Sequence, residues 1–306
     1  MPLFARKRTG LEALLHRPRP GIWEQFLAQP CVFLARTLYT WRQPLPAQPV
    51  ADPVSVVCVS DTHNSQPALP NGDVLIHAGD LTQSGSSREL QETIDWLRAQ
   101  SHPVKIVIAG NHDLLLIRVK MNDAAPETRT TATCPNGRQL RVYGSPYSAR
   151  HGNWAFQYPR SDNIWAGTVP RDVDILVTHG PPRAHLDLLR LGCVYLLREL
   201  WQVRPRLHIF GHIHEGAGTE WLPFDALQDA YERTAIAGGG IWNLLRTLNE
   251  FLRVLFRTEA EAKCLLVNPA IVGGLRDNER RRPIKVVIWN FTSKDRVHLI
   301  ASRAQR

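Results

Sequence analysis

Five short apolar runs in this 306-residue sequence each end in side chains that can bind a metal ion. The ligand types are carboxylate, carboxamide and imidazole. In chain order the residues are Asp61, His63, Asp80, Asn111, His179, His212 and His214. Because ligands of α/β sheets bind outside the carboxyl ends of the strands, loops that follow five such strands can converge on one point. The sequence therefore predicts a metal site made from all seven side chains.

The types of ligand indicate hard or borderline metal ions. Carboxylate and carboxamide oxygens together with neutral imidazoles suit Mn²⁺, Fe or Zn²⁺. Seven ligands exceed what one tetrahedral site needs, whereas two sites that share a bridging carboxylate would use them all. Two metal ions about 3.5–4 Å apart can clamp the attacking and leaving oxygens of a phosphoryl displacement and acidify a bridging water. The ligand set thus points to a metal-dependent phosphoesterase.

Taken singly, these motifs are weak indicators. Asp-x-His is usually a solvated turn, Gly-Asn-His-Asp can be a hairpin turn, and Gly-His-Ile-His is moderately specific for metal. All five motifs in this order, each at the end of a β-rich run, are hard to produce by accident. By contrast, His77 and His208 lie inside apolar runs and are expected in the core. Structural or solvent-exposed roles are expected for the remaining histidines, His16, His102, His151, His185 and His298.

The elements that must position the ligands alternate between strand and helix. Apolar, β-branched runs predict strands buried on both faces. These runs lie at 54–60, 73–79, 104–110, 173–179 and 206–212. Helical periodicity is present over 87–100 and 184–202, and 281–293 has the composition of a late strand. The alternation predicts a layered α/β fold in which a sheet is covered by helices.

The chain ahead of this region is organised differently. Residues 1–20 predict a basic arm, 22–41 predict helix on either side of Pro30, and 43–53 predict a Pro-rich linker. We therefore expect an N-terminal region, 1–50, and a catalytic domain, 51–306, with an inserted amphipathic helix near 241–257.

The predicted helix at 241–257 combines an apolar face with arginines on the opposite face. Helices that lie on membrane surfaces share this pattern. The apolar segment 22–41 is also flanked by basic residues, so that 22–41 and 241–257 could together dock on a membrane or a partner. The alternative, which we favour from the sequence, is that the helix covers the protein's own core.

The composition indicates which partners the protein binds and in which compartment it works. The formal charge is +9, but residues 1–42 contribute seven Lys or Arg against two Glu, and no nucleic-acid-binding signature accompanies the charge. Five cysteines at irregular spacing, without C-x-x-C, argue against a disulfide framework and fit a reducing compartment. No secretory signal or membrane-spanning run is evident. We expect an intracellular, cytoplasmic protein that acts on a small phosphoester.

The five ligand-bearing blocks resemble the calcineurin-like metallophosphoesterase superfamily over residues 54–292. Closer similarity is to the metallophosphoesterase-domain-containing (MPPED-like) family. It is carried by GDLTQSGSSREL, HPVKIVIAGNHD, YGSPY followed by NWAF, THGPP and RPRLHIFGHIHEGAG. The resemblance implies an αββα sandwich, in which two central mixed β-sheets are flanked by helices.

The resemblance also implies roles for individual residues. One metal ion would be held by Asp61, His63, Asp80 and His214, and the other by Asp80, Asn111, His179 and His212, with Asp80 bridging. His112 would be a non-ligand that stabilises charge on the phosphoryl group or protonates the leaving oxygen, and Asp113 would orient His112. The cofactors would be two divalent or Fe-type ions, Mn, Fe or Zn.

The sequence departs from the superfamily's protein phosphatases in one block and keeps both histidines of the last block, and both features bear on the function. Protein Ser/Thr phosphatases of the superfamily carry an Arg in the block after Gly-Asp, and residues 81–85 (LTQSG) lack it. Both His212 and His214 are present in the last block, which predicts an intact site. The expected function is a phosphodiesterase with a dinuclear metal site and a metal-activated water. The alternatives are a phosphomonoesterase or protein phosphatase, and a catalytically weak binding protein of the same fold.

Overall fold

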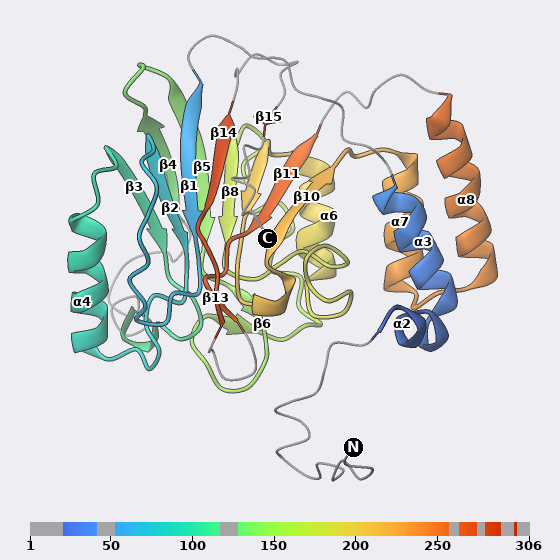
Figure 1. The fold of residues 1–306 in the computed structure, drawn as a ribbon, viewed down its shortest axis with the longest axis horizontal. Helices are drawn as coiled ribbons and strands as arrows, with labels where there is room; N and C mark the ends of the chain where they lie inside the picture. Colours follow the sequence, from blue (N-terminus) through green and yellow to red (C-terminus); the bar gives the residue numbers. More distant parts are fainter. Residues whose placement is uncertain are drawn as a thin grey trace, which may run out of the picture.

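Two mixed β-sheets packed face to face form the centre of the protein (Figure 1). The computed structural model describes residues 21–41, 53–116, 128–256, 263–273, 279–288 and 297–298. The predicted basic arm, 1–20, lies outside the described residues, as does nearly all of the predicted linker, 43–53.

The first sheet has the strand order β15-β14-β1-β2-β3. Its strands are β1 (Val54–Val59), β2 (Val74–Ala78), β3 (Val104–Ile108), β14 (Ile284–Ile288) and β15 (Val297–His298). β1, β2 and β3 are parallel, whereas β14 pairs antiparallel with β1 and with β15. The predicted late strand is thus present as β14, and it lies between β15 and β1, the first strand of the domain.

The second sheet has the order β10-β11-β9-β8-β5-β4. Its strands are β4 (Thr128–Thr133), β5 (Gln139–Ser145), β8 (Ile175–Thr178), β9 (Leu207–Ile209), β10 (Gly218–Leu222) and β11 (Cys264–Asn268). β5, β8, β9 and β11 run parallel, and β4 and β10 are antiparallel at the two edges. Two short pairs, β6 (Ser148–Ala149) with β7 (Gln157–Tyr158) and β12 (Val272–Gly273) with β13 (Glu279–Arg280), complete the described strands.

The main core lies between the two sheets. Val56 and Ile76 of the first sheet pack in one cluster with Val142, Ile175 and Ile209 of the second. The central strands β2, β8 and β9 are buried on both faces, as their apolar runs predicted. The run that forms β3 was also expected to be buried on both faces, but β3 is an edge strand whose Lys105 and Val107 are exposed.

A helix covers the outer face of each sheet. α4 (Ser87–Arg98) packs through Leu97 on the first sheet, and α6 (Val194–Val203) packs through Leu196 and Leu200 on the second. α4 begins at a capping box, in which Ser86 and Glu89 bond each other's backbone N–H groups. The αββα architecture implied by the resemblance is confirmed.

A separate group of helices stands beside the second sheet (Figure 1). It consists of α2 (Ile22–Ala28), α3 (Pro30–Thr40), α7 (Ala226–Ile236) and α8 (Ile241–Leu255). α3 joins α7 through Tyr39, whose ring stacks on Tyr231 at a centroid distance of 4.4 Å. The helices predicted on either side of Pro30 and near 241–257 are therefore present, and the division of the chain at residue 50 stays a prediction.

The helix predicted over 184–202 is only half present. α6 begins at Val194, and the preceding segment is a loop in which Ala184, Leu186 and Leu188 have positive φ. The Asp187 carboxylate accepts backbone bonds from Leu189 and Gly192 and stabilises this loop. Leucine spacing suggested a helix here, but side-chain hydrogen bonds to the backbone offer the chain an alternative to helix.

Within the described residues, no helix is both long enough and apolar enough to cross a bilayer. All five cysteines are unpaired.

Candidate metal centre

Each candidate ligand lies beyond the carboxyl end of a strand, in a loop or, for His214, at the start of the short 3₁₀ helix η1 (His214–Gly216). Asp61 and His63 follow β1, Asp80 follows β2, Asn111 follows β3, His179 follows β8, and His212 and His214 follow β9. The structure brings all seven side chains into one cluster.

The backbone of these loops turns sharply. Asp61, His63, Asp80 and His212 have φ values of 49°, 43°, 53° and 66°. Positive φ is uncommon for residues with side chains, and such strain clusters at functional sites. The surrounding fold therefore stabilises backbone conformations that these residues would rarely adopt by themselves.

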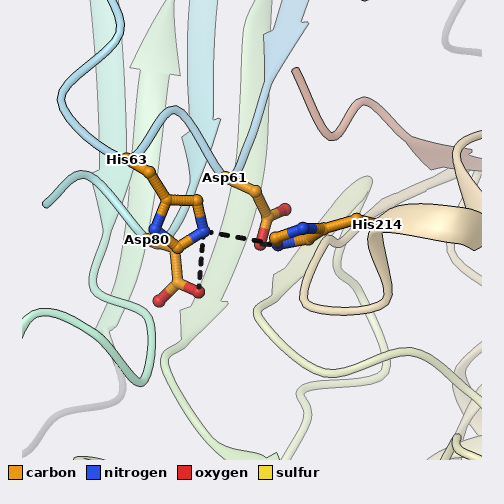
Figure 2. A group of neighbouring side chains, drawn as sticks. All are labelled: Asp61, His63, Asp80 and His214. Atoms are coloured by element: carbon orange, nitrogen blue, oxygen red, sulfur yellow. Dashed lines mark hydrogen bonds and ion pairs between the residues drawn. The ribbon is translucent and has the colours of Figure 1, made fainter. Parts of the chain in front are cut away.

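The first group of side chains is Asp61, His63, Asp80 and His214, which point toward one another in Figure 2. One ligand atom from each of the four lies within 4.8 Å of the others. Nε2 of His63 is 3.3 Å from Nε2 of His214 and 3.7 Å from Oδ2 of Asp80. Nε2 of His214 is 3.2 Å from Oδ1 of Asp61.

The second group is Asp80, His179 and His212. Nε2 of His179 lies 3.4 Å from Oδ2 of Asp80 and 2.9 Å from Oδ1 of Asn111, which adds the carboxamide to this group. Asp80 belongs to both groups, so one carboxylate stands between two clusters of ligand atoms.

The separations fit bound metal ions. Two ligand atoms that each lie about 2.1 Å from one ion are roughly 3.0–3.4 Å apart. The distances of 3.2, 3.3 and 3.4 Å within the two groups fall in this range. The donors are carboxylates and imidazoles, which Mn²⁺, Fe and Zn²⁺ accept. The cluster thus suggests a dinuclear metal site that shares Asp80.

Backbone groups orient the candidate ligands. The His212 N–H donates to both carboxylate oxygens of Asp61, at 3.0 and 3.1 Å, and the His112 N–H donates to Oδ1 of Asp80 at 2.8 Å. Nδ1 of His179 lies 3.0 Å from the carbonyl oxygen of Ala78, an acceptor, so Nδ1 carries the proton. Such outer contacts fix which nitrogen and which oxygen face a metal.

Charges within the cluster outweigh burial for the pKa values of Asp61, Asp80 and His179. Burial raises the pKa of Asp80, but the positive charge and hydrogen bond of His179 lower that pKa to about 2. Burial disfavours the charged form of His179, but Asp80 raises the pKa of this imidazole to about 9. For His212 burial dominates and lowers the pKa to about 3. An ionised carboxylate therefore faces a protonated imidazole whose proton a metal ion would displace.

Two glycines allow the loops to approach one another. A Cβ on Gly110 would overlap the backbone nitrogen and Oδ1 of Asp80, and a Cβ on Gly211 would overlap Ser60 and Oδ2 of Asp61. Any other residue at either position would displace a candidate ligand.

His112 stands beside the first group without belonging to it. Its ring contacts the edge of the His63 ring at a centroid distance of 4.7 Å. Its Nδ1 lies 2.8 Å from the carbonyl oxygen of Gln83, which leaves Nε2 for another partner. On the other side the ring stacks on Trp154 at 4.1 Å.

Asp113 does not have the contact that the resemblance implied. Its carboxylate accepts hydrogen bonds from the N–H groups of Leu81, Thr82 and Gly110 and from the Thr82 hydroxyl. The contact with the His112 imidazole belongs to Gln83 instead. Asp113 thus fixes the loop after β2 against the loop after β3. Burial, with a contribution from Asp80, raises the pKa of Asp113 to about 6.

Three contributors to the site were not predicted as site residues. Gln83 acts through its carbonyl, and no side-chain pattern reveals such a role. Trp154 lies within the NWAF block, but its stacking on His112 depends on a loop that returns from β6. Arg281 comes from beyond the last ligand block and donates to the carbonyl oxygen of His214 at 2.7 Å.

The other histidines of the described region lie outside this cluster. His77 and His208 are buried and bonded to Thr62 and Thr178, as predicted for core histidines. His102 and His185 are buried, whereas His151 is exposed.

The class of protein follows from a match to the family model of calcineurin-like phosphoesterases, which spans residues 54–216. This is more than half of the chain and includes every candidate ligand. The chain belongs to the calcineurin-like phosphoesterase family, a class of hydrolases that act on phosphoric esters.

Particular relatives refine this placement. The human metallophosphoesterase domain-containing protein 1 is 38% identical over 199 residues, which are 53% of this chain and 61% of that protein. Probable rhamnogalacturonate lyase C of Emericella nidulans is 44% identical over 301 residues, which are 92% of this chain but 29% of that protein. The chain thus spans less than two thirds of each. The crystal structure of TT1561 of Thermus thermophilus aligns with a TM-score of 0.40 at 16% identity, over 57% of this chain and 87% of that one.

Proposed function

We propose that this protein is a metal-dependent phosphodiesterase with a dinuclear metal site. The observation that carries the proposal is the position of Asp80, which is common to two groups of Asp and His ligand atoms. A carboxylate shared in this way is what a two-metal phosphoesterase requires. Family membership supports the same chemistry.

The proposed ligands follow the two groups. Asp61, His63, Asp80 and His214 would hold one ion, and Asp80, Asn111, His179 and His212 would hold the other. When bound, the ions supply a polarised phosphoryl oxygen and an acidified water. The chain itself orients the carboxylates through the N–H groups of His112 and His212.

His112 is proposed to act on the leaving group. The Gln83 carbonyl accepts from Nδ1, and the rings of His63 and Trp154 hold the imidazole on two sides. Nε2 is then the nitrogen that, when the ring is protonated, can donate a proton or a hydrogen bond to the leaving oxygen. Trp154 is 41% exposed, and its indole forms an apolar surface next to the His112 imidazole.

The preference for diesters rests on the sequence. Residues 81–85 follow Asp80 and lack the arginine that protein phosphatases of the superfamily carry in this block. A phosphomonoesterase, including a protein phosphatase, is the second candidate. A catalytically weak binding protein is the third. The lyase name of the Emericella nidulans protein describes a protein of which this chain matches 29%, and we propose no lyase activity.

Paired assays would separate these candidates. The chain is stripped with a chelator, loaded separately with Mn²⁺, Fe²⁺ or Zn²⁺, and assayed on bis(p-nitrophenyl) phosphate and on p-nitrophenyl phosphate. We expect two ions per chain by elemental analysis and faster hydrolysis of the diester. Faster hydrolysis of the monoester would favour the second candidate. Two bound ions without turnover on either ester would favour the third.

A further inference from the structure

Helix α8 exposes an apolar stripe along its whole length. At about 100° per residue, Ile241, Leu245, Leu248, Leu252 and Leu255 fall within an arc of roughly 80°. All five are exposed, and Phe256, directly after the helix, is 89% exposed. Soluble proteins rarely leave such a stripe in water.

The same helix already buries a second stripe. Leu244, Phe251 and Val254 pack in the cluster of α3 and α7, and Thr247 is buried. The core-covering role that the sequence favoured is therefore filled by this second stripe. The stripe at Leu245 and Leu252 is additional, and these two side chains remain 46% and 49% exposed.

The charged side chains of α8 indicate the kind of surface that the stripe would bind. Arg246 and Arg253 lie on the polar side of the helix, between the two stripes. Their side chains are 54% and 60% exposed. Each also bonds one acidic neighbour, Asp229 or Glu250 respectively. The only acidic residue of α8 is Glu250, which is buried on the packed side. The exposed apolar stripe itself carries no charge, and the two exposed arginines on the polar side of the helix are the groups that can contact anionic phosphates.

The neighbouring N-terminal helices extend the surface. Trp23 and Leu27 of α2 are 77% and 75% exposed, and Trp41, which caps α3, lies 6.4 Å from the Phe251 ring of α8. Tryptophans beside exposed leucines and arginines are typical of helices that lie in the interface of a bilayer.

We propose that α8 docks this protein on the surface of an anionic lipid bilayer. The helix would lie in the membrane plane, because its 15 residues are too short to cross the hydrocarbon region. Leucines of the stripe would enter the acyl boundary while the arginines contact phosphate groups.

The test is co-sedimentation of the full, metal-loaded chain with vesicles. Phosphatidylcholine vesicles with and without phosphatidylserine are compared at low and at high salt. We expect binding to the phosphatidylserine vesicles at low salt, and we expect high salt to weaken it. Leu245→Gln with Leu252→Gln should weaken binding roughly tenfold or more, because two apolar side chains no longer enter the bilayer.

Val107→Gln is the matched control. Val107 is 42% exposed on β3, outside the proposed surface, and its replacement should leave binding unchanged. If the double variant does not fold, Trp242→Gln at the start of α8 replaces it, since Trp242 is 81% exposed.

Three results would overturn the proposal. The first is no binding of the full chain to phosphatidylserine vesicles at low salt, and the second is equal binding by the stripe variants. The third is a dimer in light scattering that becomes monomeric in the double variant while vesicle binding is absent, since the stripe would then join two copies of the chain.

Discussion

At the scale of single residues, the candidate site is built from two kinds of contact. Side-chain donors form the two ligand groups, and a backbone carbonyl faces His112. The seven candidate ligands were predicted because chemistry limits metal ligands to a few side-chain types. The partner of His112 was not predicted, since the Gln83 contact is made by a backbone carbonyl and any residue type supplies one. The Asp113 contact was predicted by resemblance, and the structure places it elsewhere.

Asp80→Asn should impair both proposed metal sites. The change removes a charge that both groups of ligands share, and an amide nitrogen cannot bind an ion. We expect loss of at least one bound ion per chain and of most activity, as measured by elemental analysis and diester turnover. Asp95→Asn, on the exposed surface of α4, is the control. Two retained ions with normal turnover would contradict the bridging role.

His112→Ala should separate metal binding from chemistry. His112 contacts His63 but belongs to neither ligand group. A positioned proton donor is typically worth about 10²–10⁴ in rate. We therefore expect unchanged metal content and a loss of turnover in that range. The exposed His151→Ala serves as control. Loss of metal in His112→Ala would show that the ligand assignment around Asn111 is wrong.

At the scale of elements, the strands were the most predictable part. The runs that form β2 and β8 are apolar because both faces of these central strands are covered. The segment 184–193 was not predictable in the same way. Its leucines have helical spacing, yet the Asp187 carboxylate binds the backbone of a loop instead. Positive φ at Asp61 and Asp80 likewise depends on tertiary support.

The loop after β9 tolerates no side chain at Gly211. A Cβ there would overlap Ser60 and Asp61, so the loop carrying His212 would have to move. For Gly211→Ala we expect overpacking to lower the unfolding free energy by about 1–3 kcal/mol. We also expect metal binding to weaken. Denaturant unfolding and metal titration measure the two effects. Gly21→Ala, where the added Cβ meets only a Glu24 oxygen at 3.9 Å, should change neither. An unaltered metal titration for Gly211→Ala would refute the proposed tight approach.

At the scale of the whole molecule, a buried ionic cluster joins the helical group to the second sheet. His185 is fully buried, with Nδ1 2.7 Å from Glu220 of β10 and Nε2 2.9 Å from Glu232 of α7. The Trp201 indole of α6 also donates to Glu232, at 2.8 Å. Both imidazole nitrogens thus face carboxylates, and the ring holds two protons.

This cluster should make stability depend on pH. Burial disfavours the charge on His185, but Glu220 and Glu232 outweigh burial and raise its pKa from 6.5 to about 10. A raised pKa in the folded state adds stability that is complete below about pH 6.5 and is lost as pH rises toward 10. We expect the unfolding free energy to fall across this window, and to fall less steeply in His185→Gln.

Denaturant titrations at several pH values measure this dependence, with His151→Gln as the control for loss of an exposed histidine. Equal slopes in the protein and in His185→Gln would show that the cluster does not hold the extra proton.

The pairing of β1 with β14 has a consequence for biosynthesis. β1 is made early, yet its antiparallel partner, in which Ile288 pairs with Val54, comes more than 200 residues later. The proposed ligands are themselves spread from Asp61 to His214. While the ribosome is still translating the intervening segment, Asp61 and Asp80 lack the imidazoles that complete their groups. Loading of the proposed metal site would therefore come late in synthesis or after release, once the last imidazoles have been made and β14 can pair with β1.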